Sequence, residues 1–269
     1  MADVSLNTVT KLLQDLGAAC SEYHYKHVRG VRCKRVQTDE IWAFNYCKEK
    51  NLPGATAAPA LAGDIWTWTA ICADSKLIVS YLVGGRDAGT AFEFMQDLAD
   101  RLNGRTQLTS DGFRPYIGAV EDAFGAGIDF AMLIKIYGSD PEAEKRYSPA
   151  QCIGTRVETI QGAPEPEHVS TSYVERQNLT MRMAMRWFTR LTNGFSKRFE
   201  NHCHAVALHF AYYNFCRVHR SLRVTPGMEA GLSDHVWSVD ELVGLLETKK
   251  RAAIEAGGMK RGPYRPRKS

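Results

Sequence analysis

The chain has 269 residues, of which 44% are hydrophobic and 24% are charged, and its formal net charge is +4. These values are typical of a soluble globular protein, and the length is sufficient for one large domain or for a core with appendages. No run of 18 or more apolar residues occurs, and the N-terminus lacks the basic and apolar blocks of a signal peptide. The sequence therefore excludes a membrane-spanning protein and predicts a cytoplasmic one.

Residues 4–17 have the amphipathic pattern of a short helix, with Ser5 or Asn7 as its cap and Gly17 as its end. The pattern resembles the second helix of a helix-turn-helix, but no partner helix precedes it. Two interpretations remain open. The segment is either a remnant of a longer DNA-binding region or a helix that packs on the core.

Three apolar runs follow, at residues 35–44, 65–73 and 76–83, and we expect strands there, the last two joined as a hairpin. Asp39 lies within the first run and is expected on the face opposite Glu40, because side chains alternate along a strand. A buried carboxylate without a partner is costly, so Asp39 is difficult to explain as a structural residue.

The next part of the chain alternates helical and strand patterns. We expect a helix over residues 87–102, a strand over 106–110, a helix over 114–124, a strand over 130–137 and an irregular insertion over 138–170. Within the insertion, residues 153–161 are expected to form a small hairpin. The strand 106–110 leads directly into Asp111, so this acid is expected at a strand end.

A helix that begins near Ser172 carries Glu175, Asn178 and Arg182 on one face, because residues three and four apart are neighbours on a helix. Further helices are expected over 197–217, from Pro226, and over 238–248. From Lys249 onward, eight basic residues accompany one acid, so this tail carries +7 and the remainder of the chain −3. A basic tail on a mildly acidic body indicates a flexible arm that binds polyanions, or one that only aids solubility.

Asp39, Asp111 and Glu175 come from two strands and a helix, and such a set of carboxylates suits hard divalent cations. Two ions about 4 Å apart serve phosphodiester displacement, and the absence of zinc-like His and Cys spacing favours Mg²⁺ or Mn²⁺. Structural alternatives remain for two of the acids, because Asp111 precedes Gly112 in a common turn pair and Glu175 is placed for a capping box with Ser172. Other acids that compete for these ligand positions are Glu40, Glu158, Glu165 and Glu167.

The order of the elements and acids resembles the ribonuclease-H-like fold of DDE transposases and retroviral-type integrases. The segments Gln37–Trp42, Thr109–Gly112 and Val174–Asn178 look like those of the insertion-sequence transposases of the IS-one type, and the resemblance covers residues 33–232. It implies an α/β fold, with a mixed five-stranded sheet flanked by helices, an insertion before the last catalytic helix and a helical C-terminal extension. Family members of this type also carry a zinc ribbon and a full helix-turn-helix before this region, for which only residues 4–17 remain here.

Four segments follow from this resemblance. They are an N-terminal helical segment (1–32), a catalytic domain (33–195) with the insertion 138–170, a helical extension (196–248) and a basic flexible tail (249–269). The resemblance implies a transposase that nicks DNA ends and transfers a 3′-OH, with two Mg²⁺ or Mn²⁺ ions at Asp39, Asp111 and Glu175. It also implies a homodimer or larger oligomer, associated with a bacterial nucleoid, with terminal inverted repeats and target DNA as partners.

DNA contacts are expected from basic and amide side chains on the Glu175 helix, after the following long helix and in the tail. These are Arg176, Asn178, Arg182, Arg186, His219, Arg220, Lys260, Arg261, Arg265, Arg267 and Lys268. Two rival functions remain open. One is a metal-dependent nuclease or resolvase without strand transfer, and the other is a non-catalytic DNA-binding protein derived from a transposase.

Overall fold

The computed structural model of the chain describes residues 4–138, 152–189 and 194–255. Its centre is one six-stranded sheet of order β3-β2-β1-β4-β5-β6. The strands are β1 (Arg35–Asn45), β2 (Gly63–Cys72), β3 (Ile78–Gly84), β4 (Thr106–Ser110), β5 (Ile128–Tyr137) and β6 (Cys152–Gln161). β1, β4 and β5 are parallel to one another, whereas β2 and β6 pair antiparallel with their neighbours. The expected α/β fold with a mixed sheet is thus confirmed.

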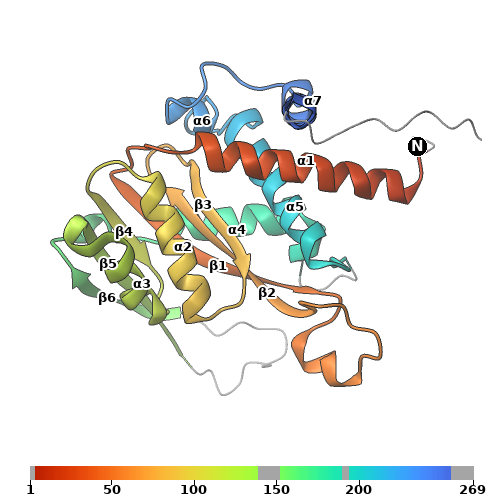
Figure 1. Cartoon of the computed structure of the whole chain (residues 1–269). Helices are drawn as coiled ribbons and strands as arrows, with labels where there is room; N and C mark the ends of the chain where they lie inside the picture. Colours follow the sequence, from red (N-terminus) through yellow and green to blue (C-terminus); the bar gives the residue numbers. More distant parts are fainter. Residues whose placement is uncertain (1–3, 139–151, 190–193, 256–269) are drawn as a thin grey trace, which may run out of the picture.

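Seven α-helices surround this sheet in the described part of the chain (Figure 1). They are α1 (Leu6–His27), α2 (Ala88–Arg101), α3 (Pro115–Phe124), α4 (Ser172–Ala184), α5 (Phe199–Ala211), α6 (Pro226–Glu229) and α7 (Val239–Glu255). A π-helical turn, Tyr212–Cys216, continues α5, so the helix expected over 197–217 is present with a change of pitch near its end. α7 extends beyond the expected end at residue 248.

Two hydrophobic cores lie on the two faces of the sheet. α2 and α3 cover one face, where Phe94 and Tyr116 pack against Trp68. α4 and α5 cover the other face, where Val174 and Phe210 belong to the second core. Alternate residues of β1 therefore point into different layers, and this alternation decides the surroundings of each acidic side chain on the strand.

The sheet has six strands rather than the expected five. The segment expected to form a hairpin by itself is one strand, β6, which pairs antiparallel with β5 over most of its length. β5 pairs with β4 on its other side, so pairing with β6 satisfies backbone donors and acceptors along both sides of β5, while β6 is the edge strand of the sheet. The insertion thus extends the sheet instead of standing apart from it.

The prediction that Gly17 ends the first helix is wrong. Ser5 is the cap, since its side chain accepts from the Thr8 amide at 3.2 Å, but the helix continues to His27. A Cβ atom at Gly17 would lie 2.5 Å from the carbonyl oxygen of His204 on α5, so the glycine allows the two helices to cross closely. Tertiary packing therefore overrides the tendency of glycine to end a helix.

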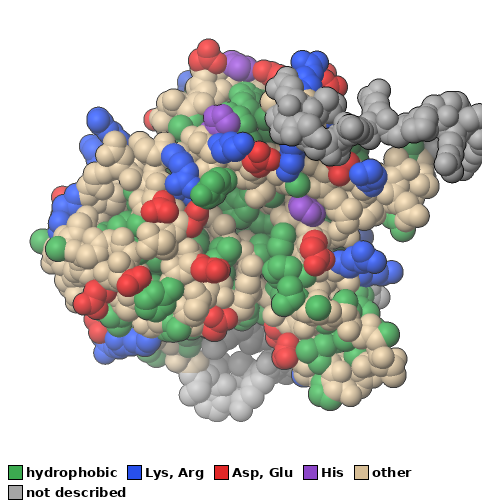
Figure 2. All heavy atoms as spheres, viewed as in Figure 1, with side chains coloured by type: hydrophobic (Ala, Val, Ile, Leu, Met, Phe, Trp, Pro, Cys, Tyr) green, Lys and Arg blue, Asp and Glu red, His purple; other side chains and the backbone are tan. Residues whose placement is uncertain are grey.

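The face that carries α2 and α3 bears acidic and basic side chains side by side, and neither sign forms a continuous patch there (Figure 2). Cys20, Cys33 and Cys72 are buried, and all seven cysteines are free thiols. Among the helices of the described ranges, none combines the length and the apolar character needed to cross a membrane.

Candidate active site

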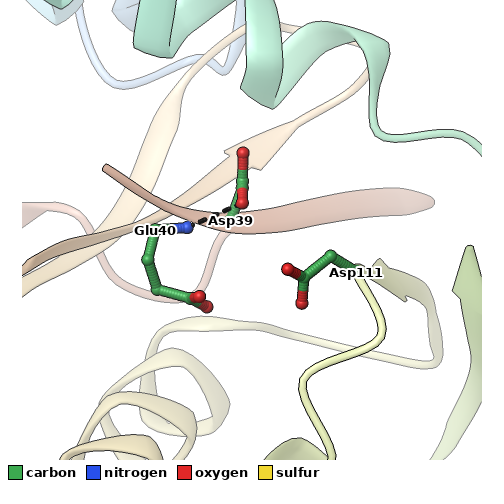
Figure 3. A group of neighbouring side chains, drawn as sticks. All are labelled: Asp39, Glu40 and Asp111. Carbon is green, nitrogen blue, oxygen red and sulfur yellow. Dashed lines mark hydrogen bonds between the residues drawn. The ribbon is translucent and has the colours of Figure 1, made fainter. Parts of the chain in front are cut away.

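The parallel pairing of β1 and β4 brings Asp39 and Asp111 together. Gln37 is opposite Thr109 in this pairing. Asp39 and Asp111 each lie two residues further along the parallel direction, so they come side by side just beyond the end of β4. Carboxylate oxygens of Asp39, Glu40 and Asp111 all lie within 4.8 Å of one another (Figure 3). In the described ranges, this is the only such group of three metal-donor side chains.

Two N–H donors hold the carboxylate of Asp39. Its Oδ1 accepts from the Glu40 amide at 2.9 Å, and its Oδ2 accepts from Nδ2 of Asn178 on α4 at 2.8 Å. Asp39 forms no ion pair with any described residue. Burial, followed by the negative charge of Asp111, raises the pKa of Asp39 to about 6. The positive charge of Lys135 lowers the pKa only in part, so the carboxylate is oriented but has no ion-pair partner among the described residues.

Asp111 has two roles in the structure. Its Oδ1 accepts from the Phe113 amide at 2.9 Å, which is the turn interaction expected for an Asp-Gly pair. Its Oδ2 lies 3.4 Å from Nη2 of Arg86. Asp111 can therefore hold the turn with Oδ1 while its Oδ2 faces the other charged side chains.

Glu40 points to the opposite face of β1 from Asp39, as expected from the alternation along a strand (Figure 3). Its carboxylate accepts from the Tyr116 hydroxyl on α3 and from Nε of Arg86 at 3.1 Å, and its side chain is 1% exposed. Burial and the charge of Asp111 raise the pKa of Glu40 to about 7. Glu40 is thus the acid that is already satisfied by protein donors, although it lies within the cluster.

Glu175 lines the same cavity as Asp39 and Asp111, although it is not a member of the tight group. Its Oε1 accepts from the Thr171 hydroxyl and lies 2.6 Å from Nζ of Lys135 on β5. Thr171, rather than Ser172, occupies the cap position of α4, so the capping box expected with Ser172 does not form.

The competing glutamates of the insertion lie elsewhere. Glu158 pairs with Arg114 at 3.1 Å, Glu165 lies 3.2 Å from His168, and Glu167 is exposed in a short turn. None of the three lines the cavity of Asp39 and Asp111.

The cavity itself has a volume of about 580 Å³ and combines acids with cations. Arg86, Arg114 and Lys135 line it together with the three acids. Neighbouring carboxylates repel one another, and their oxygens are the hard ligands that Mg²⁺ and Mn²⁺ prefer. Because Asp39 and Asp111 converge and Asp39 has no ion-pair partner among the described residues, the residues present fit a divalent metal ion.

Sequence reasoning missed both cations that contact the acids. Arg86 follows β3 in a Gly-Gly-Arg-Asp segment that gave no signal of its own. Lys135 interrupts the apolar run over residues 130–137, where a strand is expected. A single lysine in such a run was a usable signal, because a buried ammonium group requires a partner.

The residues expected to contact DNA have different surroundings. Asn178 is 4% exposed and holds Asp39, whereas Arg176 and Arg186 are exposed and Arg182 is half-buried. Two further residues, His219 and Arg220, line a second cavity together with Arg176. Five of the expected contacts lie outside the described residues, namely Lys260, Arg261, Arg265, Arg267 and Lys268.

No protein-family model and no curated protein sequence matches the chain. Among solved structures, the chain is similar to one described as a cryo-EM structure of piggyBac transposase synaptic complex with hairpin DNA. The TM-score is 0.34 and the sequence identity is 12%. The match covers 84% of this chain and 55% of that chain, so this chain spans about half the length of the other.

Proposed function

We propose that the chain is a DDE-type transposase that nicks DNA at the ends of a mobile element and joins the freed 3′-OH to target DNA. One observation carries this proposal. The carboxylates of Asp39 and Asp111 converge where β4 ends beside β1 in the middle of the sheet, and Glu175 lines the same cavity. That placement matches the set of acids that the sequence resemblance implies.

Asp39 and Asp111 would hold Mg²⁺ or Mn²⁺ between them, and Glu175 would complete the site. The chemistry that two such ions supply is activation of the attacking oxygen and stabilisation of the leaving oxygen. Asn178 fixes the orientation of Asp39 through its 2.8 Å hydrogen bond. Positive charge for the phosphate oxygens comes from Arg86 and Lys135, which lie in the cavity wall.

The proposed partners are the terminal inverted repeats and the target DNA. Phosphate contacts position a protein on DNA without reading its sequence. Exposed Arg176 and Arg186 lie on and just after α4 and would make such contacts, and the sequence adds the basic residues of the tail to them. A homodimer or larger oligomer and a nucleoid location complete the proposal and come from the resemblance alone.

A joining assay tests the function. The substrates are duplexes that derive from the DNA flanking the coding sequence and end in a recessed 3′-OH, with a supercoiled plasmid as target and Mn²⁺ as the metal. We expect the native protein to join them, and EDTA, Asp111→Asn and Glu175→Gln to abolish joining. Glu167→Gln is the matched control, because this exposed glutamate lies outside the cavity.

The same assay separates the rival functions. Plasmid cleavage without joined product identifies a nuclease or resolvase, and DNA binding without cleavage or joining identifies a non-catalytic protein. Calorimetry with Mn²⁺ tests the metal site directly. Equal binding of Mn²⁺ by the native protein and by Asp39→Ala contradicts the assignment of Asp39 as a ligand.

A further inference from the structure

A second cavity, of about 750 Å³, lies on the other side of α4 from the acidic cluster. Residues Tyr173, Arg176, Gln177 and Thr180 form its α4 wall, since they recur at helical spacing on one face. The opposite wall comes from the segment that follows the π-helical turn, including Arg217 and Arg220. α4 thus separates this cavity from Glu175 and Asn178.

The lining of this cavity is strongly basic. Lys76, Arg176, Arg217 and Arg220 line it, and neither aspartate nor glutamate does. None of the four forms an ion pair in the part of the chain that the structure describes. By contrast, six other described arginines pair with carboxylates, namely Arg35, Arg86, Arg101, Arg105, Arg114 and Arg156. Uncompensated positive charges that share one cavity repel one another, and an anion would relieve that repulsion.

Lys76 adds a buried cation to the exposed arginines of this cavity. This lysine is 8% exposed, and its backbone has a φ of 61°, a conformation that is uncommon for a residue with a side chain. Its Nζ donates to the carbonyl oxygen of Ala73 and lies 3.3 Å from the centroid of the Tyr173 ring. Burying an ammonium group without a carboxylate is costly, and a bound anion would offset that cost.

Two further residues that line the cavity, Gln177 and His219, indicate an unsatisfied donor and a positive potential there. Gln177 is 2% exposed, and its Nε2 has no hydrogen-bond partner among the described residues. Buried donors are normally satisfied, so this amide requires an acceptor. Burial, then the positive charges of Lys76 and Arg217, lower the pKa of His219. The imidazole therefore responds to the positive potential of the cavity.

We infer that this cavity binds the terminal 5′-phosphate of a nucleic-acid strand. A terminal phosphate carries about two negative charges at neutral pH and three acceptor oxygens, which suits several cations better than the single charge of an internal phosphodiester. The volume is in the range of pockets that enclose small ligands, and the rings of Tyr173 and Tyr213 offer surfaces for the attached nucleotide.

The inference rests on the proposed function and adds a product site to it. Hydrolysis that frees a 3′-OH breaks the bond between phosphorus and the 3′ oxygen. The oxygen of the attacking water stays on phosphorus, so the other fragment leaves with a 5′-phosphate. α4 carries Glu175 on one side and Arg176 on the other. One rigid helix would thus hold the cut strand end beside the site that produced it.

Fluorescence anisotropy in EDTA tests the site with a labelled single-stranded oligonucleotide that carries either a 5′-phosphate or a 5′-hydroxyl. We expect the native protein to bind the phosphorylated strand about tenfold more tightly, which is the effect of a charge-assisted contact worth about 1.4 kcal/mol. Arg217→Ala and Lys76→Met should reduce the preference to less than twofold. Lys11→Ala removes one exposed positive charge on α1 and should retain the preference.

Equal binding of the two strands by the native protein overturns the inference, and so does a preference that survives Arg217→Ala. Since Arg217 is exposed, its replacement should leave the melting temperature unchanged, which circular dichroism verifies. Adenosine monophosphate serves as a competitor. If it displaces the oligonucleotide at a similar concentration, the cavity binds free nucleotides and the nucleic-acid assignment is wrong. The experiment needs no metal and can be repeated on Asp111→Asn, so its failure is distinguishable from a failure of strand transfer.

Discussion

At the scale of single residues, the proposed metal ligand Asp39 is expected to destabilise the metal-free protein when it is ionised. Its carboxylate is held by Glu40 and Asn178 beside Asp111, with no cation among its contacts. Its pKa is raised from 3.8 to about 6, so between these values the folded protein binds a proton that the unfolded chain has released. The stability linked to this group is therefore fully present below about pH 4 and declines as the pH rises through 6.

We therefore expect Asp39→Asn to stabilise the metal-free protein at pH 8 and to have no such effect at pH 4. A shift of about two pKa units corresponds to at most roughly 3 kcal/mol, or several degrees in melting temperature for a chain of this size. Thermal unfolding in EDTA at both pH values measures this difference. Mn²⁺ should raise the melting temperature of the native protein but not that of the variant.

Asp122→Asn is the control, because Asp122 is an exposed acid on α3. It should change the melting temperature little at either pH. A lower melting temperature for Asp39→Asn than for the native protein at pH 8 would contradict this expectation. It would show that the surrounding protein groups already stabilise the ionised carboxylate without a bound cation.

At the scale of elements, the close crossing of α1 and α5 depends on one missing side chain. Gly17 lies against the backbone of His204, where an added Cβ would approach the Cα atom to 2.7 Å and the Cβ atom to 2.5 Å. Backbone atoms cannot move aside as the end of a flexible side chain can. Leu16 and Cys20, on either side of this crossing, belong to the core that α1 shares with α5 and α7.

Gly17→Ala should consequently destabilise the protein by about 2 kcal/mol, as overpacking does in other cores. The sign is informative, because alanine in a helix interior is otherwise favoured over glycine by about 1 kcal/mol. Urea unfolding measures the change. Gly244→Ala on α7 is the matched control and should stabilise, since nothing lies within 4 Å of the added methyl group.

At the scale of the whole molecule, a buried arginine connects the N-terminal helix α1 to α2, which covers one face of the sheet. Arg101, at the end of α2, pairs with Asp97 at 2.6 Å and donates to the carbonyl oxygens of His24 and Val28 at 3.1 Å each. These carbonyls lie at the C-terminal end of α1, where the His24 oxygen also accepts from the Val28 amide at 3.0 Å and Arg101 is a donor to the Val28 oxygen. Burial is the main cause that lowers the pKa of His24 to about 3, so its ring is neutral beside the guanidinium.

Arg101→Met should destabilise the protein by about 3 kcal/mol, because it removes the cation that pairs with Asp97 and the side-chain donor to the Val28 carbonyl at the end of α1. Arg105→Met is the control. Arg105 pairs with Asp129 at the same 2.6 Å but is 52% exposed, and exposed pairs contribute little. Urea unfolding of both variants gives the comparison, and limited proteolysis tests whether α1 detaches first. Equal losses for the two variants would contradict a special role for the buried pair.

Much of the fold was predictable from the sequence because its signals are local. Strands and helices appear where the apolar periodicity changes, Asp87 caps α2, and Thr106–Ser110 is a strand as expected. Side-chain alternation placed Asp39 and Glu40 on opposite faces of β1. These features depend on residues a few positions apart, whose geometry the backbone itself imposes.

The tertiary structure decided what depends on contacts between distant parts of the chain. Pairing with β5 adds β6 to the sheet as a sixth strand. Packing against α5 accompanies the continuation of α1 beyond Gly17. The partners Lys135 and Arg86 reach the acids from other strands and turns, and Lys76 meets Arg217 across one cavity. The sequence by itself thus determined the order of the elements and of the acids, whereas packing decided their neighbours, because the energy of a contact depends on burial and partners that no local pattern contains.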